Sequence, residues 1–346
     1  MPLIFRGHDT TVPPRWARRN LVSFDLSNRP GHKITDALQI GLINNMPDSA
    51  LEDTEMQFFE LIDAASGDMP VFVSLYSLPE VPRGELSQQH IKKFYFDFQT
   101  LLHSRLDGII ITGTEPRHKN LRDEPYWHSL TAAFDWAETN TTSTILSCLA
   151  AHASVLHSDG VQRVPLPDKQ FGVFGYTKIA NYAFIAEAAD SSRFPHSRWN
   201  EVREASLVAR GYTVLDRSAE AGVNLFAKQK KQSLFVYLQG HPEYFTHTLL
   251  KEYRRDIRRF LAAERETYPS MPHGYFDEAA TRLLDDFRQA AELDRREDLL
   301  ASFPERLLIG YIKNSWQSSS TALYRDWLGH LSSARSSEHP KSLLLA

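Results

Sequence analysis

Residues 143–160 read STILSCLAAHASVLHSDG, and this stretch decides the fold class. The first part, 143–147, is a short strand-forming run, and the part that follows has helical character as far as Gly160. A strand that passes directly into a helix is half of a β-α-β unit, the unit that builds parallel sheets. Cys148, the only cysteine of the chain, stands at the junction.

The same alternation recurs along the chain. We expect further buried strands at 37–45, 69–78, 107–113 and 233–240, and helices at 51–66, 91–106, 123–140, 246–266, 277–297 and 317–333. The intervening region 161–230 predicts a few antiparallel strands. The sequence therefore predicts an α/β fold, a mainly parallel sheet flanked by helices with extra helices near the C-terminus.

Three parts of the chain differ in character. Residues 1–36 have no clear periodicity and are expected to form an irregular N-terminal arm. Residues 37–334 are expected to form a single α/β domain. The Ser-rich end, 335–346, is expected to be a frayed tail.

Composition narrows the function classes. The chain has 346 residues, 42% of them hydrophobic, and a net charge of −4, which gives no sign of nucleic-acid or anionic-membrane binding. No apolar run approaches the ~20 residues of a membrane span, and the start lacks the apolar core of a secretory signal. One cysteine forms no internal disulfide. We expect a cytoplasmic protein with small-molecule substrates.

The residues that follow the strands are the candidates for a site. In open α/β sheets, sites form beyond the carboxyl ends of the strands. Segments that follow the predicted strands are NNMPD at 44–48, TGTEPR at 112–117, Cys148, and GHPEY at 240–244. We expect these four segments to meet at one edge of the sheet.

Cys148 is the candidate nucleophile. At the N-terminus of a helix the dipole favours the thiolate, which is the nucleophilic form of cysteine. A sharp turn there would direct the backbone N–H of Leu149 toward an oxyanion, and the Gly113 loop is a candidate second donor. The alternative is a buried structural cysteine, because free cysteine is among the most buried residue types.

His241 and Glu243 are a candidate base and its orienting acid. They are two residues apart, so on extended backbone their side chains project to the same side. A carboxylate beside an imidazole fixes its tautomer, as a nucleophile–base–acid triad requires. The alternatives are a solvated loop and a metal site, for which no third ligand is evident. His152, four residues after Cys148, is a rival base.

Several segments resemble one family. They are LINNMPDSALEDTEMQFFELI, FYFDFQTLLHSRLDGIIITGTEP, DKQFGVFGY, PHSRW, GHPEYFTHTLLKEYRRDI and SWQSSSTALYRDWLGHL. In order and spacing they resemble the homoserine O-acyltransferases of the homoserine O-succinyltransferase type. The resemblance covers about 20–334 and implies a class I glutamine-amidotransferase-like (flavodoxin-like) fold.

The resemblance also implies a mechanism. Such enzymes transfer an acyl group by a ping-pong reaction, from acyl-CoA to a cysteine and then to the hydroxyl of homoserine. No metal or cofactor is implied beyond acyl-CoA as co-substrate, and a homodimer is typical. The matching positions are Cys148 as nucleophile, His241 as general base, Glu243 as its orienting acid, Lys169 near the acyl group, and Ser197 and Arg255 near the amino-acid acceptor.

The chain departs from the family pattern in several places, among them the PDSALEDTE segment at 47–55, where the family has a different turn. Leu149 and His152 stand where the family usually has Trp and Gln. In the TGTEPR loop, Arg117 stands at the position that separates acyl donors in the family. A guanidinium there can pair with the free carboxylate of a succinyl group, so we expect succinyl-CoA as the donor.

Other functions stay open at this stage. The donor could be acetyl-CoA, and the acceptor serine rather than homoserine. A glutamine amidohydrolase would use the same three residues on the same fold. A binding protein that has lost activity is a further alternative, although the presence of Cys148, His241 and Glu243 together argues against it.

Overall fold

The computed structural model describes residues 4–6, 16, 22–23, 37–185 and 189–338. Its main sheet runs in the order β2-β1-β4-β3-β5-β6-β13-β12-β9. Neighbours from β2 to β13 are parallel, and β12 and β9 are antiparallel to the strands beside them. The strands are β1 (Ile4–Arg6), β2 (Val22–Ser23), β3 (Leu38–Ile43), β4 (Val71–Tyr76), β5 (Gly108–Ile111), β6 (Ser143–Ser147), β9 (Thr213–Val214), β12 (Leu225–Lys230) and β13 (Ser233–Leu238).

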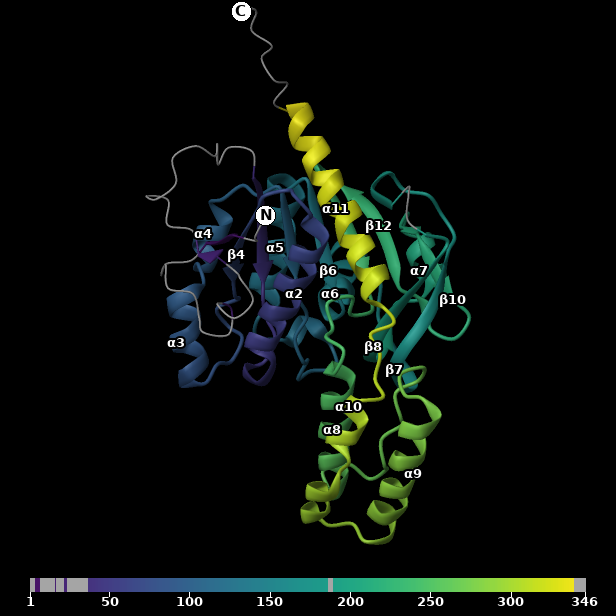
Figure 1. The fold of residues 1–346 in the computed structure, drawn as a ribbon. Helices are drawn as coiled ribbons and strands as arrows, with labels where there is room; N and C mark the ends of the chain where they lie inside the picture. Colours follow the sequence, from purple (N-terminus) through teal and green to yellow (C-terminus); the bar gives the residue numbers. More distant parts are fainter. Residues whose placement is uncertain (1–3, 7–15, 17–21, 24–36, 186–188, 339–346) are drawn as a thin grey trace, which may run out of the picture.

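Helices cover both faces of this sheet (Figure 1). On one face α2 (Leu51–Ser66) and α11 (Gln317–Glu338) pack in one hydrophobic cluster with inward residues of β3, β4 and β6. On the other face α5 (Trp127–Asn140) and α6 (Leu149–Asp159) pack in a second cluster. The mainly parallel α/β fold predicted from the sequence is confirmed. Shorter helices are α3 (Glu85–Phe94), α4 (Phe98–Leu102), α7 (Glu204–Val208), and the 3-10 helices η2 (Asp48–Ala50), η3 (Leu121–Asp123), η4 (Ala183–Ile185) and η5 (Glu297–Ser302).

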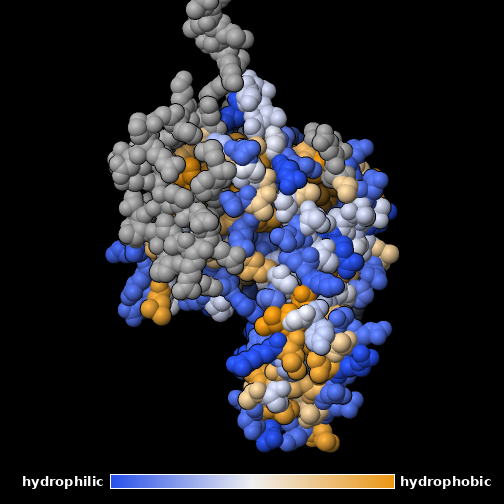
Figure 2. Space-filling view, viewed as in Figure 1, coloured by the Kyte–Doolittle hydropathy of each residue, from blue (hydrophilic) through white to orange (hydrophobic). Residues whose placement is uncertain are grey.

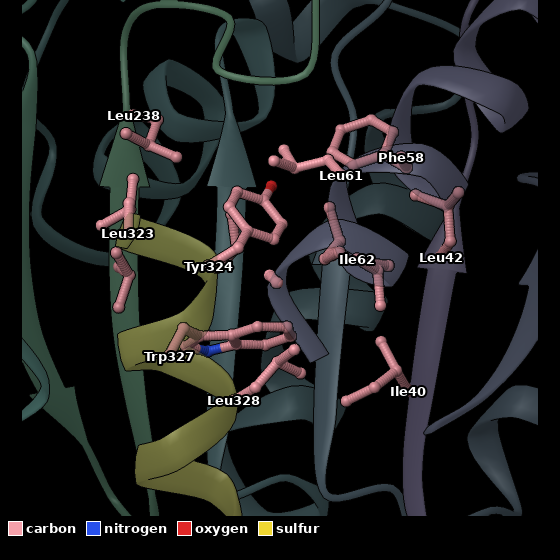
Figure 3. Packing of buried hydrophobic residues seen from close by; sticks show 14 of the residues in the cluster. Ile40, Leu42, Phe58, Leu61, Ile62, Leu238, Leu323, Tyr324, Trp327 and Leu328 are labelled. Carbon is pink, nitrogen blue, oxygen red and sulfur yellow. The ribbon is translucent and has the colours of Figure 1, made fainter. Parts of the chain in front are cut away.

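The C-terminal helix is part of the core. Figure 3 shows Leu323, Tyr324, Trp327 and Leu328 of α11 facing side chains of the sheet and of α2. Trp327 is fully buried, and its indole N–H donates to the Ser143 hydroxyl of β6 at 3.0 Å. The last helix thus packs directly against the strand that leads to Cys148.

A second sheet and a helical lobe complete the molecule. The second sheet is antiparallel, in the order β11-β10-β7-β8. The lobe extends from the sheet body (Figure 1), and apolar residues gather on its face in Figure 2. It has its own hydrophobic cluster around Ile257, Leu284 and Trp316. The elements are β7 (Val164–Lys178), β8 (Ser191–Glu201), β10 (Asp216–Ser218), β11 (Gly222–Val223), α8 (Thr248–Leu261), α9 (Glu278–Leu293) and α10 (Glu305–Ile309).

Two helix predictions differ from the structure. The single helix predicted at 91–106 is divided between α3 and α4, because Phe96 bridges Tyr76 of β4 and Asp97 caps the new helix at the Thr100 N–H. The helix predicted at 246–266 is shorter, since α8 begins at Thr248 and ends at Leu261.

The chain ends also differ from the predictions. The frayed tail was predicted to begin at 335, but α11 continues to Glu338, and the Arg335 guanidinium donates to Asp107 at 2.6 Å and to the Ala37 carbonyl at 2.8 Å. Within the predicted irregular arm, β1 pairs in parallel with β4, and Trp16 is buried. Apart from β1, Trp16 and β2, the arm lies outside the described residues, as do residues 339–346.

Candidate active site

Cys148 lies at a sharp turn between β6 and α6. Its backbone has φ 52° and ψ −110°, in the left-handed region that non-glycine residues rarely adopt. The Cys148 N–H donates to the Leu238 carbonyl of the neighbouring β13 at 2.7 Å, which ties the turn to the sheet. The residue is partly exposed and lines a cavity of about 800 Å³. A strained, accessible turn at a helix N-terminus is the environment expected for a nucleophile.

His241 and Glu243 line the same cavity and contact each other. The His241 Nδ1 atom lies 2.8 Å from the Glu243 Oε1 atom, and both side chains are nearly buried. The predicted contact between the two side chains is present, but the extended backbone assumed in that prediction is wrong. Residues 241–244 form a turn in which the Tyr244 N–H donates to the His241 carbonyl at 3.2 Å. This turn, which contains Pro242, brings the two side chains together.

The electrostatics favour a protonated His241. Burial opposes the charged imidazolium, but the negative charges of Cys148 and Glu243 and the hydrogen bonds to them outweigh it and raise the pKa of His241 well above its usual value. The ring of Tyr244 stacks on the imidazole with centroids 4.3 Å apart. The structure therefore places a thiol, an imidazole and a carboxylate in one cavity, with the imidazole bonded to the carboxylate.

The candidate oxyanion donors lie side by side. A Cβ atom placed on Gly113 would lie 2.9 Å from the backbone N of Leu149 and 2.7 Å from its Cβ. The TGTEPR loop after β5 therefore approaches the Cys148 turn so closely that a side chain at position 113 has no room. Both Gly113 and Leu149 line the cavity.

The three predicted substrate-binding residues meet around Glu252 and Asp256. The Lys169 Nζ atom lies 2.8 Å from Asp256 and 3.6 Å from Glu252. The Ser197 hydroxyl donates to Glu252, and the Arg255 guanidinium lies 3.2 Å from Asp256. Sequence reasoning missed the two acids because the region was interpreted as a basic helix. Their spacing of four residues on a helix was the available signal, since it places both on one face.

Arg117 is not brought to the site. It is exposed and is absent from the cavity lining, whereas Glu115 and Pro116 are part of it. The buried Glu124 side chain accepts the backbone N–H groups of Arg117 and His118 at 2.6 and 2.7 Å. These bonds turn the loop away from the cavity after Pro116. The prediction that Arg117 selects the acyl group is therefore not supported.

His152 has a structural environment. It is buried, and its Nε2 atom lies 2.9 Å from the Gln239 side-chain oxygen, which also accepts the Val202 N–H. Burial lowers the pKa of His152 to about 3, so the ring is neutral near pH 7. The rival base is thus a link between α6 and the end of β13.

The described residues form neither a metal site nor a membrane-spanning helix. Within residues 4–6, 16, 22–23, 37–185 and 189–338, no group of three or more His, Cys, Asp and Glu side chains is arranged to hold a metal ion. In the same part of the chain, no helix combines the length and the apolar character that a membrane crossing requires.

A cysteine, a histidine and a glutamate that share one cavity at the carboxyl edge of a parallel sheet define an α/β enzyme. The family model described as homoserine O-succinyltransferase matches residues 17–337. A homoserine O-succinyltransferase of Rhodopseudomonas palustris is 45% identical over 296 residues, 86% of this chain and 89% of that protein. One of Methylorubrum extorquens is 44% identical over 295 residues, 85% of this chain and 87% of that protein. The chain belongs to the homoserine O-succinyltransferase family and is an acyltransferase.

Solved structures offer a more distant likeness. A glutamine amidotransferase of Thermotoga maritima is 13% identical, has a TM-score of 0.42, and is covered to 98% by 85% of this chain. The glutaminase domain of Trypanosoma brucei CTPS, solved with bound acivicin, is 12% identical with a TM-score of 0.43 and coverages of 69% and 98%. The fold class itself rests on the sheet order and helix layers described above.

Proposed function

We propose that this protein transfers a succinyl group from succinyl-CoA to the hydroxyl of L-homoserine, through an acyl-enzyme on Cys148, as a step of methionine biosynthesis. Family membership supports the substrates, since the relatives bear the name of this reaction. The observation that carries the mechanism is the placement of Cys148, His241 and Glu243 in one cavity, with the His241 Nδ1 atom 2.8 Å from the Glu243 carboxylate.

The first half-reaction forms the acyl-enzyme. The Cys148 thiolate attacks the thioester carbonyl carbon, and a new carbon–sulfur bond forms. The oxygen of the tetrahedral intermediate carries the charge, which the Leu149 N–H and the Gly113 loop stabilise. When the intermediate collapses, CoA leaves as a thiolate and takes the proton from the His241 imidazolium.

The second half-reaction transfers the acyl group. Neutral His241 takes the proton of the homoserine hydroxyl as its oxygen attacks the acyl carbon. The carbon–sulfur bond to Cys148 breaks, and the ester is released. The thiolate and the imidazolium are restored, so the cycle closes without another reactant. Glu243 holds the imidazole in the tautomer whose Nε2 atom serves both steps.

The charged cluster beside the triad suits an amino-acid acceptor. Homoserine carries an ammonium and a carboxylate, and the cluster offers both signs of charge next to the Ser197 hydroxyl. We assign the acceptor carboxylate to Arg255, which is 46% exposed and so is accessible. Lys169 is assigned to the boundary between the acceptor and the acyl group, because it reaches Asp256 in the cavity wall.

Initial rates with two donors and two acceptors test the proposal. With succinyl-CoA and homoserine we expect parallel lines in double-reciprocal plots, because the first product leaves before the acceptor binds. Replacing succinyl-CoA with acetyl-CoA, or homoserine with serine, should lower kcat/KM at least ~10-fold, the scale of a single lost polar contact. Intersecting lines, or hydrolysis of glutamine in place of acyl transfer, would contradict it.

The proposal extends to the form of the enzyme. Thiol–thioester exchange requires no metal, so activity should persist after dialysis against EDTA, and loss of activity that Zn²⁺ restores would contradict this.

We also propose a homodimer in the cytoplasm. Light scattering of the purified protein tests the oligomeric state, and a mass of one chain, 39.6 kDa, would contradict the dimer.

A further inference from the structure

Arg163 is a cavity residue that the mechanism does not use. It lies between α6 and β7, is partly buried, and lines the same cavity as Cys148. Its Nη2 atom donates to the carbonyl oxygens of His118 at 3.5 Å and Lys119 at 3.1 Å. Within the described part of the chain, its Nε and Nη1 atoms have no hydrogen-bond partner. One edge of the guanidinium is thus fixed, and the other donors remain available.

The surroundings hold this charge in place. Burial is the main cause that lowers the pKa of Arg163, and the Glu124 carboxylate and the Cys148 sulfur oppose this effect. The guanidinium keeps its charge because arginine is protonated throughout the working pH range, and it lines the same cavity as the nucleophile. The Glu124 carboxylate is itself buried and accepts two backbone N–H groups of the 112–117 loop and its continuation. Both bonds go to the Oε1 atom, and within the described residues the Oε2 atom has no hydrogen-bond partner, so Glu124 uses no donor of Arg163.

Other cavity cations near the triad are already paired. The three donor nitrogens of Arg198 bond to His196, Asn200 and Ala221 at 3.2, 2.9 and 2.8 Å. Lys169 is bound to Asp256. Among these three cations of the described cavity lining, Arg163 is the one with whole nitrogen atoms, Nε and Nη1, that have no hydrogen-bond partner.

We propose that Arg163 binds the terminal carboxylate of the acyl group and makes the cavity selective for dicarboxylic acyl donors. The inference rests on the acyl-enzyme proposed above. In a succinyl thioester, two methylene groups separate the carboxylate from the carbonyl carbon bound to Cys148, so its partner must lie close to the sulfur. The planar guanidinium fork matches a carboxylate in two parallel hydrogen bonds. Arg163 thus takes the role that the sequence assigned to Arg117.

The test compares donors that differ in the carboxylate. Butyryl-CoA has an acyl chain of the same length as succinyl-CoA and a methyl group where the carboxylate stands. In Arg163→Met, kcat/KM for succinyl-CoA should fall ~10–100-fold, as expected for a lost charge-assisted hydrogen bond, while the value for butyryl-CoA changes less than ~3-fold. Arg163→Lys should restore part of the succinyl preference, because the charge remains. Arg122→Met, at an exposed arginine of η3 outside the cavity lining, is the matched control.

Three results would overturn the inference. If kcat/KM falls equally for succinyl-CoA and butyryl-CoA in Arg163→Met, the residue only holds the loop. If Arg117→Met loses succinyl selectivity and Arg163→Met does not, the carboxylate binds at the loop. If the Arg122→Met control shows the same selective loss, general charge and not a specific contact is responsible. A wild-type enzyme that forms no acyl-enzyme with succinyl-CoA would instead refute the proposed function.

Discussion

At the scale of the residue, the site depends on the unusual backbone of Cys148. A φ of 52° at a residue with a Cβ costs about 1–3 kcal/mol, and the hydrogen bond to Leu238 and the packing of α6 maintain it. This backbone places Cys148 at the cavity surface with Leu149 beside it. Cysteine in this position is therefore not explained as a small core residue.

Replacing Glu243 with Gln tests the orienting role. Glu243 raises the pKa of His241, so its loss lowers that pKa and leaves the imidazole neutral at lower pH. In the second half-reaction, which needs neutral His241, the acidic limb of the pH–rate profile should shift to lower pH. The maximal rate should fall about 10²–10⁴-fold because the imidazole is no longer oriented.

A matched control for Glu243→Gln is Glu278→Gln, which removes a carboxylate from the first turn of α9. The control should change neither the rate nor the position of the limb. An acidic limb that stays in place in Glu243→Gln would show that this carboxylate does not act on the base.

At the scale of the element, the approach of the β5–α5 loop to the Cys148 turn shapes the site. In Gly113→Ala the new Cβ would meet Leu149 at 2.7 Å, which displaces the loop or the turn. We expect kcat to fall about 10²–10³-fold, the effect of losing an oxyanion donor. Gly175→Ala is the control, because a Cβ there meets nothing within 4 Å. Unchanged kcat in Gly113→Ala would place the oxyanion elsewhere.

A second element, the turn before His241, depends on Asp216. The Asp216 side chain accepts the N–H groups of Asn224 and Leu225, and the Asn224 side chain accepts the Gly240 N–H at 2.8 Å. The backbone of His241 is fixed in turn by its N–H, which donates to the Pro195 carbonyl at 2.8 Å. Burial is the main cause that raises the pKa of Asp216 to about 7.

The free energy of unfolding should therefore depend on pH through Asp216. A folded-state pKa above the unfolded value means that the folded chain binds the proton more tightly, so stability falls as pH rises from about 4 to about 7. Urea unfolding at pH 5 and pH 8 should show a loss of roughly 2–3 kcal/mol from this group. In Asp216→Asn this part of the slope should vanish, and an unchanged slope would refute the assignment.

At the scale of the whole molecule, the last helix closes the core over the strand that presents Cys148. Trp327→Ala removes a fully buried indole and its bond to Ser143, and should cost about 3–5 kcal/mol of unfolding free energy. Leu293→Ala, at a position 91% exposed, should change it by less than about 0.5 kcal/mol. Equal effects in chemical denaturation would mean that α11 is not part of the cooperative core.

The order of strands and helices was predictable because the parallel strands are short apolar runs and α2 follows a clear helical period. The edge where Cys148 and His241 meet followed from the topology of such sheets. Two details could not be predicted from the sequence. The break between α3 and α4 depends on a bridge to β4, and the exclusion of Arg117 from the cavity depends on the buried Glu124. Both are contacts between residues that local pattern does not connect.

The most direct test of the mechanism is the mass of the intact protein after brief mixing with succinyl-CoA in the absence of acceptor. We expect an increase of about 100 Da, located on the peptide that contains Cys148, absent in Cys148→Ala, and removed when homoserine is added. A protein that turns over succinyl-CoA and homoserine without ever carrying this adduct, or that carries it on another residue, would contradict the acyl-enzyme.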